Sequence, residues 1–191
     1  ANEQVYAIFE THTDLIKRGK IQKPVEFGHK IFLAESARGL ITQYGVLDGN
    51  PSDQIHVKPS LQRHKQVFGF APDLYSSDRG FFTEDNIKQC KKAGVKLVCI
   101  PQRGGKRSSD REAFENSPPF KAGQRFRAGI EGRISVLFRG RGMKRCPDEG
   151  RERFEKFVGA CVLANNLMVI ANLLIQKEKR EKEKGQGRKA A

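Results

Sequence analysis

The chain has 191 residues, of which 36 are lysine or arginine and 22 are aspartate or glutamate, so its formal net charge at pH 7 is +14. This length suits one domain with a sizeable hydrophobic core and is short for two. The excess of cations favours a polyanionic partner, nucleic acid before a membrane, because clustered cations release counterions from phosphates. The alternative is a basic surface that serves only solubility.

The cysteines and histidines exclude a structural zinc site of the usual spacing. The histidines are scattered, and no CxxC motif or Cys/His ligand spacing occurs. Each cysteine lies in or beside an apolar stretch, which predicts reduced and mostly buried thiols at Cys90, Cys99, Cys146 and Cys161. No signal peptide is recognisable, so a cytoplasmic location is expected. The first residue, Ala1, lies close to the apolar run VYAIFE, which suggests a chain entered part-way.

The first quarter of the chain predicts strands. Residues 5–9 form a short apolar and aromatic run that is typical of a strand, and the polar, basic residues 11–23 predict a loop or hairpin tip. The β-rich runs 25–36 and 40–47 are separated by a short turn, so they predict an antiparallel hairpin.

Two helices are expected in the middle of the chain. Turn residues 48–53 precede a run with helical spacing that Gly69 ends, and a second helix begins at Thr83 and is stopped by Gly94. Strands are expected before and after the second helix, over residues 72–77 and 95–101.

The stretch 102–121 is rich in Gly, Ser, Pro and charge, which predicts an exposed and mobile loop; its part 104–119 is a candidate DNA contact. A helical pattern follows, breaks at Gly140 and Gly142, and resumes near residue 148.

Residues 157–175 are apolar enough to suggest a membrane span, but three asparagines and the basic context favour a buried packing helix. The sequence thus predicts an α/β domain over residues 1–176 and a charged, disordered tail over 177–191.

Two acids stand out as candidates for chemistry. Asp78 ends a predicted strand and precedes a glycine turn, which would project its carboxylate over the carboxyl end of the strand. Glu131 is the single acid of the basic segment 125–145, which has a helical pattern. A helix packed across the same edge of the sheet would bring Glu131 close to Asp78. Such oxygens suit hard divalent cations. The alternative is that Asp78 is a turn acid and Glu131 an ion-pair partner of Arg127, four residues before it.

The cations of the same segment would hold DNA phosphates if the acids bind metal, or would otherwise form a solvated face. The residues concerned are Arg127, Arg133, Arg139, Arg141, Lys144 and Arg145.

Several ordered motifs resemble those of bacterial insertion-sequence DDE transposases. SDRGFF resembles their Asp-x-Gly-Tyr motif, and RAGIEGRISVLFRGRGMKR resembles their Arg-x-x-x-Glu helix. VYAIFETHTDLIKRGK, EFGHKIFLAE and FVGACVLANNL are similar to the unclassified (ISNCY-type) branch, so the resemblance covers nearly the whole chain. Three positions depart from the family pattern: Phe81 replaces Tyr, Gln124 stands where Tyr is usual, and Phe138 stands where Lys is usual.

The resemblance implies a ribonuclease H-like fold, a mixed sheet flanked by helices, truncated here at its N-terminal strand. In that family three acids bind two Mg²⁺ (or Mn²⁺) ions for DNA hydrolysis and strand transfer. Asp78 would be the second acid, Glu131 the third, and Arg127 the family's arginine. The first acid would lie on a strand upstream of the run VYAIFE.

Three other acids are available as substitutes for the missing one. Each has a simpler interpretation, Asp14 in a basic loop, Asp48 in a turn and Asp53 at a helix N-terminus.

The resulting hypothesis is the C-terminal catalytic portion of a transposase that binds element ends and target DNA, works as a homodimer on paired ends and needs no membrane. Two other hypotheses remain open: a catalytically inactive DNA-binding remnant of a transposase, and a basic RNA-binding module.

Overall fold

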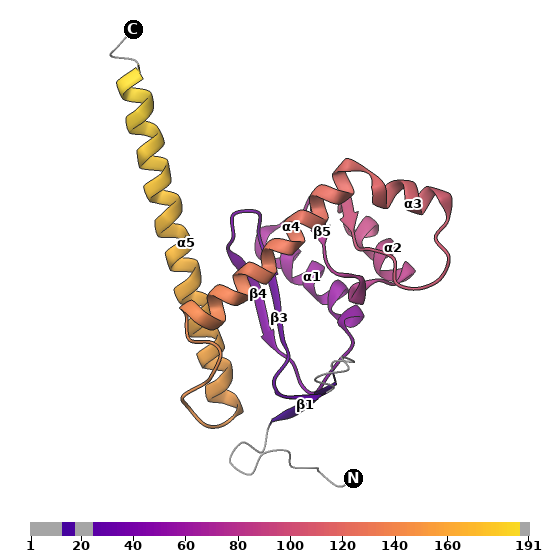
Figure 1. Ribbon diagram of the computed structural model, residues 1–191, viewed down its shortest axis with the longest axis horizontal. Coiled ribbons are helices and arrows are strands. Elements are labelled where there is room, and N and C mark those ends of the chain that lie inside the picture. The colour runs from indigo at the N-terminus through magenta and orange to yellow at the C-terminus, as the bar shows by residue number, and fades with distance from the viewer. Residues whose placement is uncertain (1–12, 18–24, 188–191) are drawn as a thin grey trace.

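The computed structural model describes residues 13–17 and 25–187, and the strand expected at residues 5–9 lies outside them. The fold is mixed α/β, as the sequence predicted (Figure 1). The strands are β1 (Asp14–Lys17), β2 (Val25–Gly28), β3 (Ile31–Glu35), β4 (Ile41–Val46), β5 (Leu74–Ser76) and β6 (Leu97–Cys99). The helices are α1 (Val57–Phe68), α2 (Glu84–Ala93), α3 (Ser109–Asn116), α4 (Pro118–Ser135) and α5 (Arg151–Gly187). Short 3₁₀ segments η1 (Asp53–His56) and η2 (Arg79–Phe81), and a π-helical segment η3 (Val136–Gly140), adjoin them.

The described strands form three separate pairs. β3 and β4 are antiparallel, with a register shift between Ala34 and Glu35, which confirms the predicted hairpin. β1 and β2 are also antiparallel, so the prediction of a loop over 11–23 is wrong for residues 14–17. β5 and β6 are parallel, with Tyr75 opposite Val98. The hydrophobic alternation in DLIK is too short to mark a strand, and pairing with β2 decides its conformation.

Local capping signals set the ends of α1 and α2 where the sequence predicted them. Gly69 follows α1 with φ of +79°, and its N–H bonds the carbonyl of Lys65 at 2.9 Å. The Thr83 hydroxyl accepts the Asn86 N–H at 2.9 Å, and Gly94 closes α2 with φ of +99°. The left-handed backbone conformation costs less free energy for glycine than for any other residue, so both helices end at these glycines.

The prediction of a mobile loop over 102–121 is wrong for its second half, which forms α3 and the start of α4. Ser108 and Ser117 cap the two helices with their hydroxyls, so the serines mark helix starts rather than loop. The Arg111 guanidinium bonds the Ile100 carbonyl and lies 5.3 Å from the centre of the Phe82 ring, which holds α3 against the body.

Two hydrophobic clusters form the core. The first lies between α1, α2 and the β5–β6 pair and comprises Val57, Leu61, Ile87, Cys90, Val95, Val98 and Ile100. The second lies between the β3–β4 hairpin, η3 and α5 and comprises Ile41, Leu137, Met143, Val158, Cys161 and Val162. α4 connects the two regions, because it packs on β5 and β6 and η3 continues it to Leu137 in the second cluster.

α5 is buried on one face and only along its first part. Val158 and Cys161 face the hairpin, whereas the side chains of Leu163, Leu167 and Leu174 are 60%, 57% and 56% exposed. The prediction of a buried packing helix is therefore correct only for that inner face. The helix also continues to Gly187, so residues 177–187, for which disorder was predicted, are helical.

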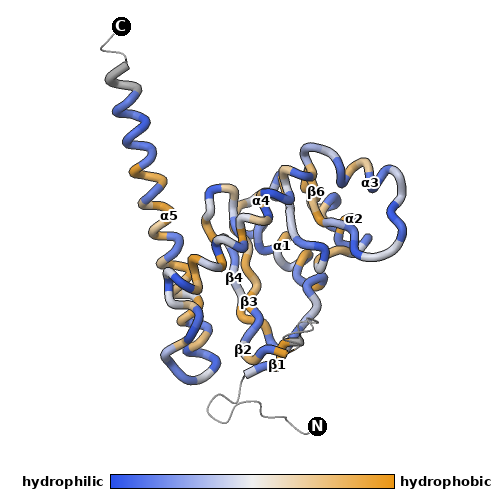
Figure 2. Tube along the Cα trace, in the orientation of Figure 1, coloured by the Kyte–Doolittle hydropathy of each residue, from blue (hydrophilic) through white to orange (hydrophobic). Residues whose placement is uncertain are grey.

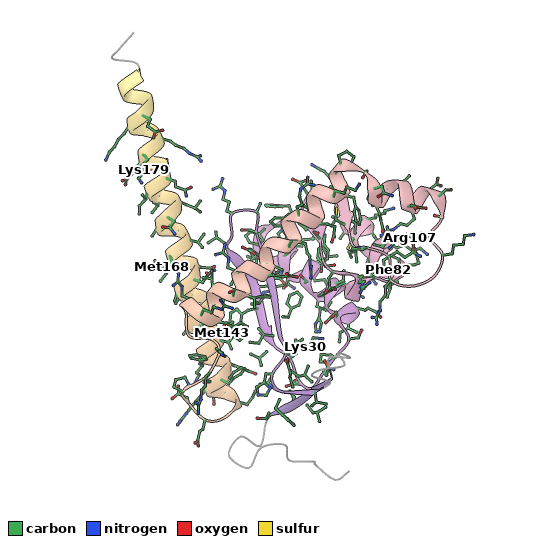
Figure 3. The ribbon with its side chains drawn as sticks, viewed as in Figure 1. Lys30, Phe82, Arg107, Met143, Met168 and Lys179 are labelled. Atoms are coloured by element: carbon green, nitrogen blue, oxygen red, sulfur yellow. The ribbon has the colours of Figure 1, made fainter. Side chains whose placement is uncertain are left out.

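Figure 1 shows α5 projecting from the body, and Figure 2 shows its apolar middle giving way to a hydrophilic C-terminal part. Met168, labelled in Figure 3, lies on this projecting part. Among the described helices, α5 is long and apolar enough to cross a membrane, a property that core helices of soluble proteins can share.

Two asparagines of α5 lie where the helix meets the β3–β4 hairpin. Asn165 is almost fully buried. The Asn166 amide accepts the N–H of Ile41 and donates to the carbonyl of Ile41, both at 2.9 Å. These two hydrogen bonds fix α5 against β4.

Candidate active site

Asp78 lies where the sequence predicted it, directly after β5 at the carboxyl end of the parallel pair. Its Oδ1 accepts the N–H of Gly80 at 2.6 Å, which fixes the side chain across the turn. A Cβ at Gly80 would lie 2.8 Å from Asp78 Oδ1 and 2.8 Å from Asp53 Oδ2. A side chain at Gly80 would push these two carboxylates aside, so the contact shows that Asp53 and Asp78 both lie next to Gly80.

Close packing of α4 on the parallel strands positions the second acid. A Cβ at Gly123 would lie 2.5 Å from Cys99 Sγ, so the helix backbone approaches β6 as closely as it can. The Ser76 hydroxyl donates to the Gly123 carbonyl at 2.8 Å. The Gln124 amide donates to the carbonyls of Ser77 and Cys99. These contacts hold α4 across the strand end that carries Asp78.

Arg127, one helical turn after Gly123, lies between the two candidate acids. One of its terminal nitrogens is 3.2 Å from Glu131 Oε1, and the other is 3.6 Å from Asp78 Oδ2. The structure therefore brings together three residues from distant parts of the sequence. It equally contains the simpler arrangement, an ion pair between Arg127 and Glu131 on successive turns of one helix.

The donor chemistry of Asp78 and Glu131 fits a divalent cation such as Mg²⁺, which prefers carboxylate oxygens. A guanidinium already lies between them, so positive charge is accommodated at this position. Glu131 is 67% exposed and Asp78 is 43% exposed, which leaves both open to a ligand. Within the described residues, no three His, Cys, Asp or Glu side chains are close enough to hold a metal ion together.

The three substitute acids have different surroundings. Asp14 accepts the N–H of Gly49 at 3.0 Å and lies 3.2 Å from His29, and Asp48 pairs with Arg151 at 2.9 Å. Both therefore hold the β1–β2 pair and the start of α5 rather than the site.

Asp53 is the exception among these acids. It begins η1, as expected, but its carboxylate faces Gly80 and pairs with Lys30 at 2.6 Å. Its proximity to Asp78 depends on the contact between η1 and η2, which no local sequence signal could have indicated.

An open cleft of about 770 Å³ lies on the Asp53 side of Asp78. Lys30 and Arg107, both labelled in Figure 3, reach it from separate parts of the fold. Its lining combines two acids, four cations and small or polar residues: Lys30, Asn50, Pro51, Ser52, Asp53, Asp78, Arg79, Gly80, Gln102, Arg103, Gly104 and Arg107. Sequence reasoning did not single out Lys30, Arg79 or Arg103, because these cations lie in three separate connections.

The predicted DNA-binding cations divide into two groups. Arg133 is mostly buried, and its Nε is 2.9 Å from Glu35 Oε1, so it joins α4 to β3 and is not free for phosphate. Arg141 is half-buried and donates to the carbonyl of Gly140. The remaining cations after α4, Arg139, Lys144 and Arg145, are exposed.

The cysteines near the site are structural. Burial raises the pKa of Cys90 and of Cys99 to about 11, so both thiols are protonated at neutral pH. Among the described residues all four cysteines are free, and Cys146 is the least buried. The prediction of reduced and mostly buried cysteines is confirmed for this part of the chain.

The arrangement can therefore attract a divalent cation through Asp78 and Glu131 and phosphates through the surrounding cations. No protein-family model matches the chain, and neither a curated protein nor a solved structure is similar to it. The functional interpretation depends on these residues and their geometry.

Proposed function

We propose that the chain is part of the catalytic domain of a DDE transposase, which cleaves DNA and transfers the strand in a metal-dependent reaction. The observation that carries the proposal is the convergence of Asp78, Arg127 and Glu131 at the end of a parallel strand pair. Acids at this edge, held by a packed helix, suit the binding of metal and phosphate.

The order of secondary structure supports a ribonuclease H-like fold. After the antiparallel β3–β4 pair come α1, β5 with Asp78 following it, α2, the parallel β6, the short α3, and α4 with Glu131. Among the described strands, β3 and β5 each have one hydrogen-bonded neighbour. One further strand between them would unite the pairs in a mixed sheet. It would also carry the third acid towards Asp78.

In this mechanism Asp78 and Glu131 would hold Mg²⁺ or Mn²⁺, and two ions are expected once the third acid is present. Ions held there would supply Lewis-acid chemistry for phosphoryl transfer, at the attacking and at the leaving oxygen. Arg127 offsets the charge of both carboxylates in the metal-free protein, and its guanidinium would contact a phosphate oxygen if a cation took over that role. Arg139, Lys144 and Arg145 would bind DNA phosphates beyond the acids, since all three are exposed.

Isosteric amides test these roles in the complete protein. Asp78→Asn and Glu131→Gln remove a charge without removing shape, so each should lower Mg²⁺-dependent nicking of an element-end duplex by at least about 100-fold. Asp73→Asn is the matched control, because Asp73 is 81% exposed and pairs with Lys96 at the surface. Normal nicking by either site variant would refute its assigned role.

A catalytically inactive DNA-binding remnant is the second candidate. It is favoured by one observation, that no three acids of the described residues lie close enough to hold a metal ion together, although Asp53 approaches Asp78. This alternative predicts salt-sensitive DNA binding, no nicking with Mg²⁺ or Mn²⁺, and binding that survives Asp78→Asn. Tighter binding to structured RNA than to DNA in a competition titration would instead favour an RNA-binding module.

A further inference from the structure

The cleft beside Asp78 has an excess of positive charge that its own acids do not neutralise. Asp53 pairs with Lys30, and Asp78 is paired from outside the cleft by Arg127. Arg107 is partly neutralised by Glu115 at 3.2 Å. Arg79 and Arg103 are exposed and form no ion pair within the described part of the chain. Two guanidiniums without an ion pair among the described residues therefore line one cleft, which suits the binding of an anion.

The size of the cleft admits a small anion or a single nucleic-acid strand but not a duplex. About 770 Å³ lies in the range of sites for small molecules or a few chain units and is too little to enclose a duplex. Gly104 lines the cleft with a φ of +70°, so part of the wall is backbone without a side chain. A Cβ at Gly104 would meet no atom within 4 Å, which shows that this wall is open.

The composition of the lining favours recognition of a phosphate backbone over recognition of bases. Bases in single strands are usually held by stacking on aromatic side chains. Among the described residues that line the cleft, none is aromatic, and the neutral members Asn50, Ser52 and Gln102 are hydrogen-bonding side chains. Binding should therefore depend on charge and little on sequence.

The cleft also has a defined position relative to the acids. Asp78 lines it, whereas Arg127 and Glu131 lie on the α4 side of the same carboxylate. A phosphodiester held at Asp78 would therefore have its neighbouring phosphates within reach of the cleft.

We propose that this cleft binds the phosphate backbone of a single DNA strand next to the bond that is cut, with Arg79 and Arg103 as its principal contacts. Lys30 and Arg107 add charge to the walls, and Asp53 orients Lys30. The inference rests on the proposed function, and it adds that the DNA must be unpaired, or become unpaired, at this point. A frayed or single-stranded end is thus the form that the site accepts.

The test measures binding apart from cleavage. Fluorescein-labelled single-stranded, frayed-end and blunt oligonucleotides of equal length are titrated with the complete protein in EDTA, and anisotropy is recorded at several salt concentrations. The double variant Arg79→Ala/Arg103→Ala is compared with Lys91→Ala/Lys92→Ala. The control removes the same charge from exposed positions at the end of α2, away from the cleft.

The cleft variant should bind single-stranded and frayed DNA at least about ten times more weakly, with little change for the blunt duplex. For single-stranded DNA, the slope of log affinity against log salt concentration should become shallower by about 0.7 for each lost phosphate contact. The control should change affinity by less than about twofold. Both changed arginines are exposed, so unchanged thermal unfolding of the variant should accompany the loss.

Equal losses in the two double variants, wild-type binding by the cleft variant, or an equal loss for the blunt duplex would overturn the proposal. Failure of the proposed function gives a different result, because it leaves nicking absent or insensitive to Asp78→Asn whatever the binding data show. If nicking depends on Asp78 but DNA binding is unchanged in Arg79→Ala/Arg103→Ala, the proposed transposase function stands and the proposed role of the cleft is wrong. Tighter binding of single-stranded RNA than of single-stranded DNA in the same titration would also count against the proposal.

Discussion

The two hydrophobic clusters differ in how completely their helices are covered. In the first, α2 turns Ile87 and Cys90 inward and keeps charged residues outward, so its one apolar face is fully used. In the second, α5 buries Val158 and Cys161 but leaves a row of leucines exposed on the opposite side. An amphipathic helix specifies its own inner face, whereas a helix that is apolar all round does not. The candidate site belongs to the first region, where Gly123 locks α4 to β6.

The sharpest test of this difference replaces one large apolar side chain in each region. Ile100 is fully buried in the first cluster, so Ile100→Ala should lower the free energy of unfolding by about 2–5 kcal/mol through lost contacts and a cavity. Leu174 on α5 is 56% exposed, and Leu174→Ala should cost less than about 0.5 kcal/mol. Urea denaturation of both variants provides the comparison. Similar losses would mean that the outer face of α5 is covered in solution.

A second pair of variants tests how closely α4 packs where it leaves the first cluster. The new methyl group of Gly123→Ala would collide with Cys99, so it should destabilise the protein by about 1–3 kcal/mol. A methyl group at Gly129, on the same helix, would meet no atom within 4 Å, so Gly129→Ala should stabilise the protein by up to about 1 kcal/mol. Opposite shifts in thermal midpoint are expected. A stabilising Gly123→Ala would show that α4 stands further from β6.

The smallest effect concerns the histidines of η1 and α1. Burial lowers the pKa of His56 and of His64, and the charge of Lys30 lowers that of His56 further. The unfolded chain therefore binds more protons below its own histidine pKa of about 6.5, so stability falls as the pH drops through that value. The double variant His56→Gln/His64→Gln should lose less stability between pH 7 and pH 5. An identical pH profile in the variant would contradict this assignment.

Local signals allowed much of the first region to be predicted from the sequence. Thr83, Gly69 and Gly94 fix helix ends through neighbours in the chain, and the apolar run around Val98 predicts a covered strand. The expectation that Glu131 would approach Asp78 from a packed helix agrees with their common contact to Arg127.

The sequence did not predict α3, the position of Asp53 or the structural role of Arg133, because neighbouring residues in the chain do not determine these features. Ser108 and Ser117 lie among residues typical of loops, so their capping role was missed and α3 was not predicted. The position of Asp53 beside Gly80 depends on tertiary packing. Arg133 looks like any other cation of a basic segment, and only its approach to Glu35 shows that it is structural.

The hydrogen bonds of Asn166 also bear on which edge of the β3–β4 hairpin is open to further pairing. A carboxamide combines a carbonyl acceptor with N–H donors, the same kinds of group that a peptide unit offers, so at Ile41 the side chain bonds as one residue of a neighbouring strand would. Open strand edges recruit strands from other molecules. At Ile41, α5 therefore occupies backbone groups of β4 that would otherwise be open to another strand. Among the described strands none pairs with the far side of β3, which is the direction in which the hairpin can be extended.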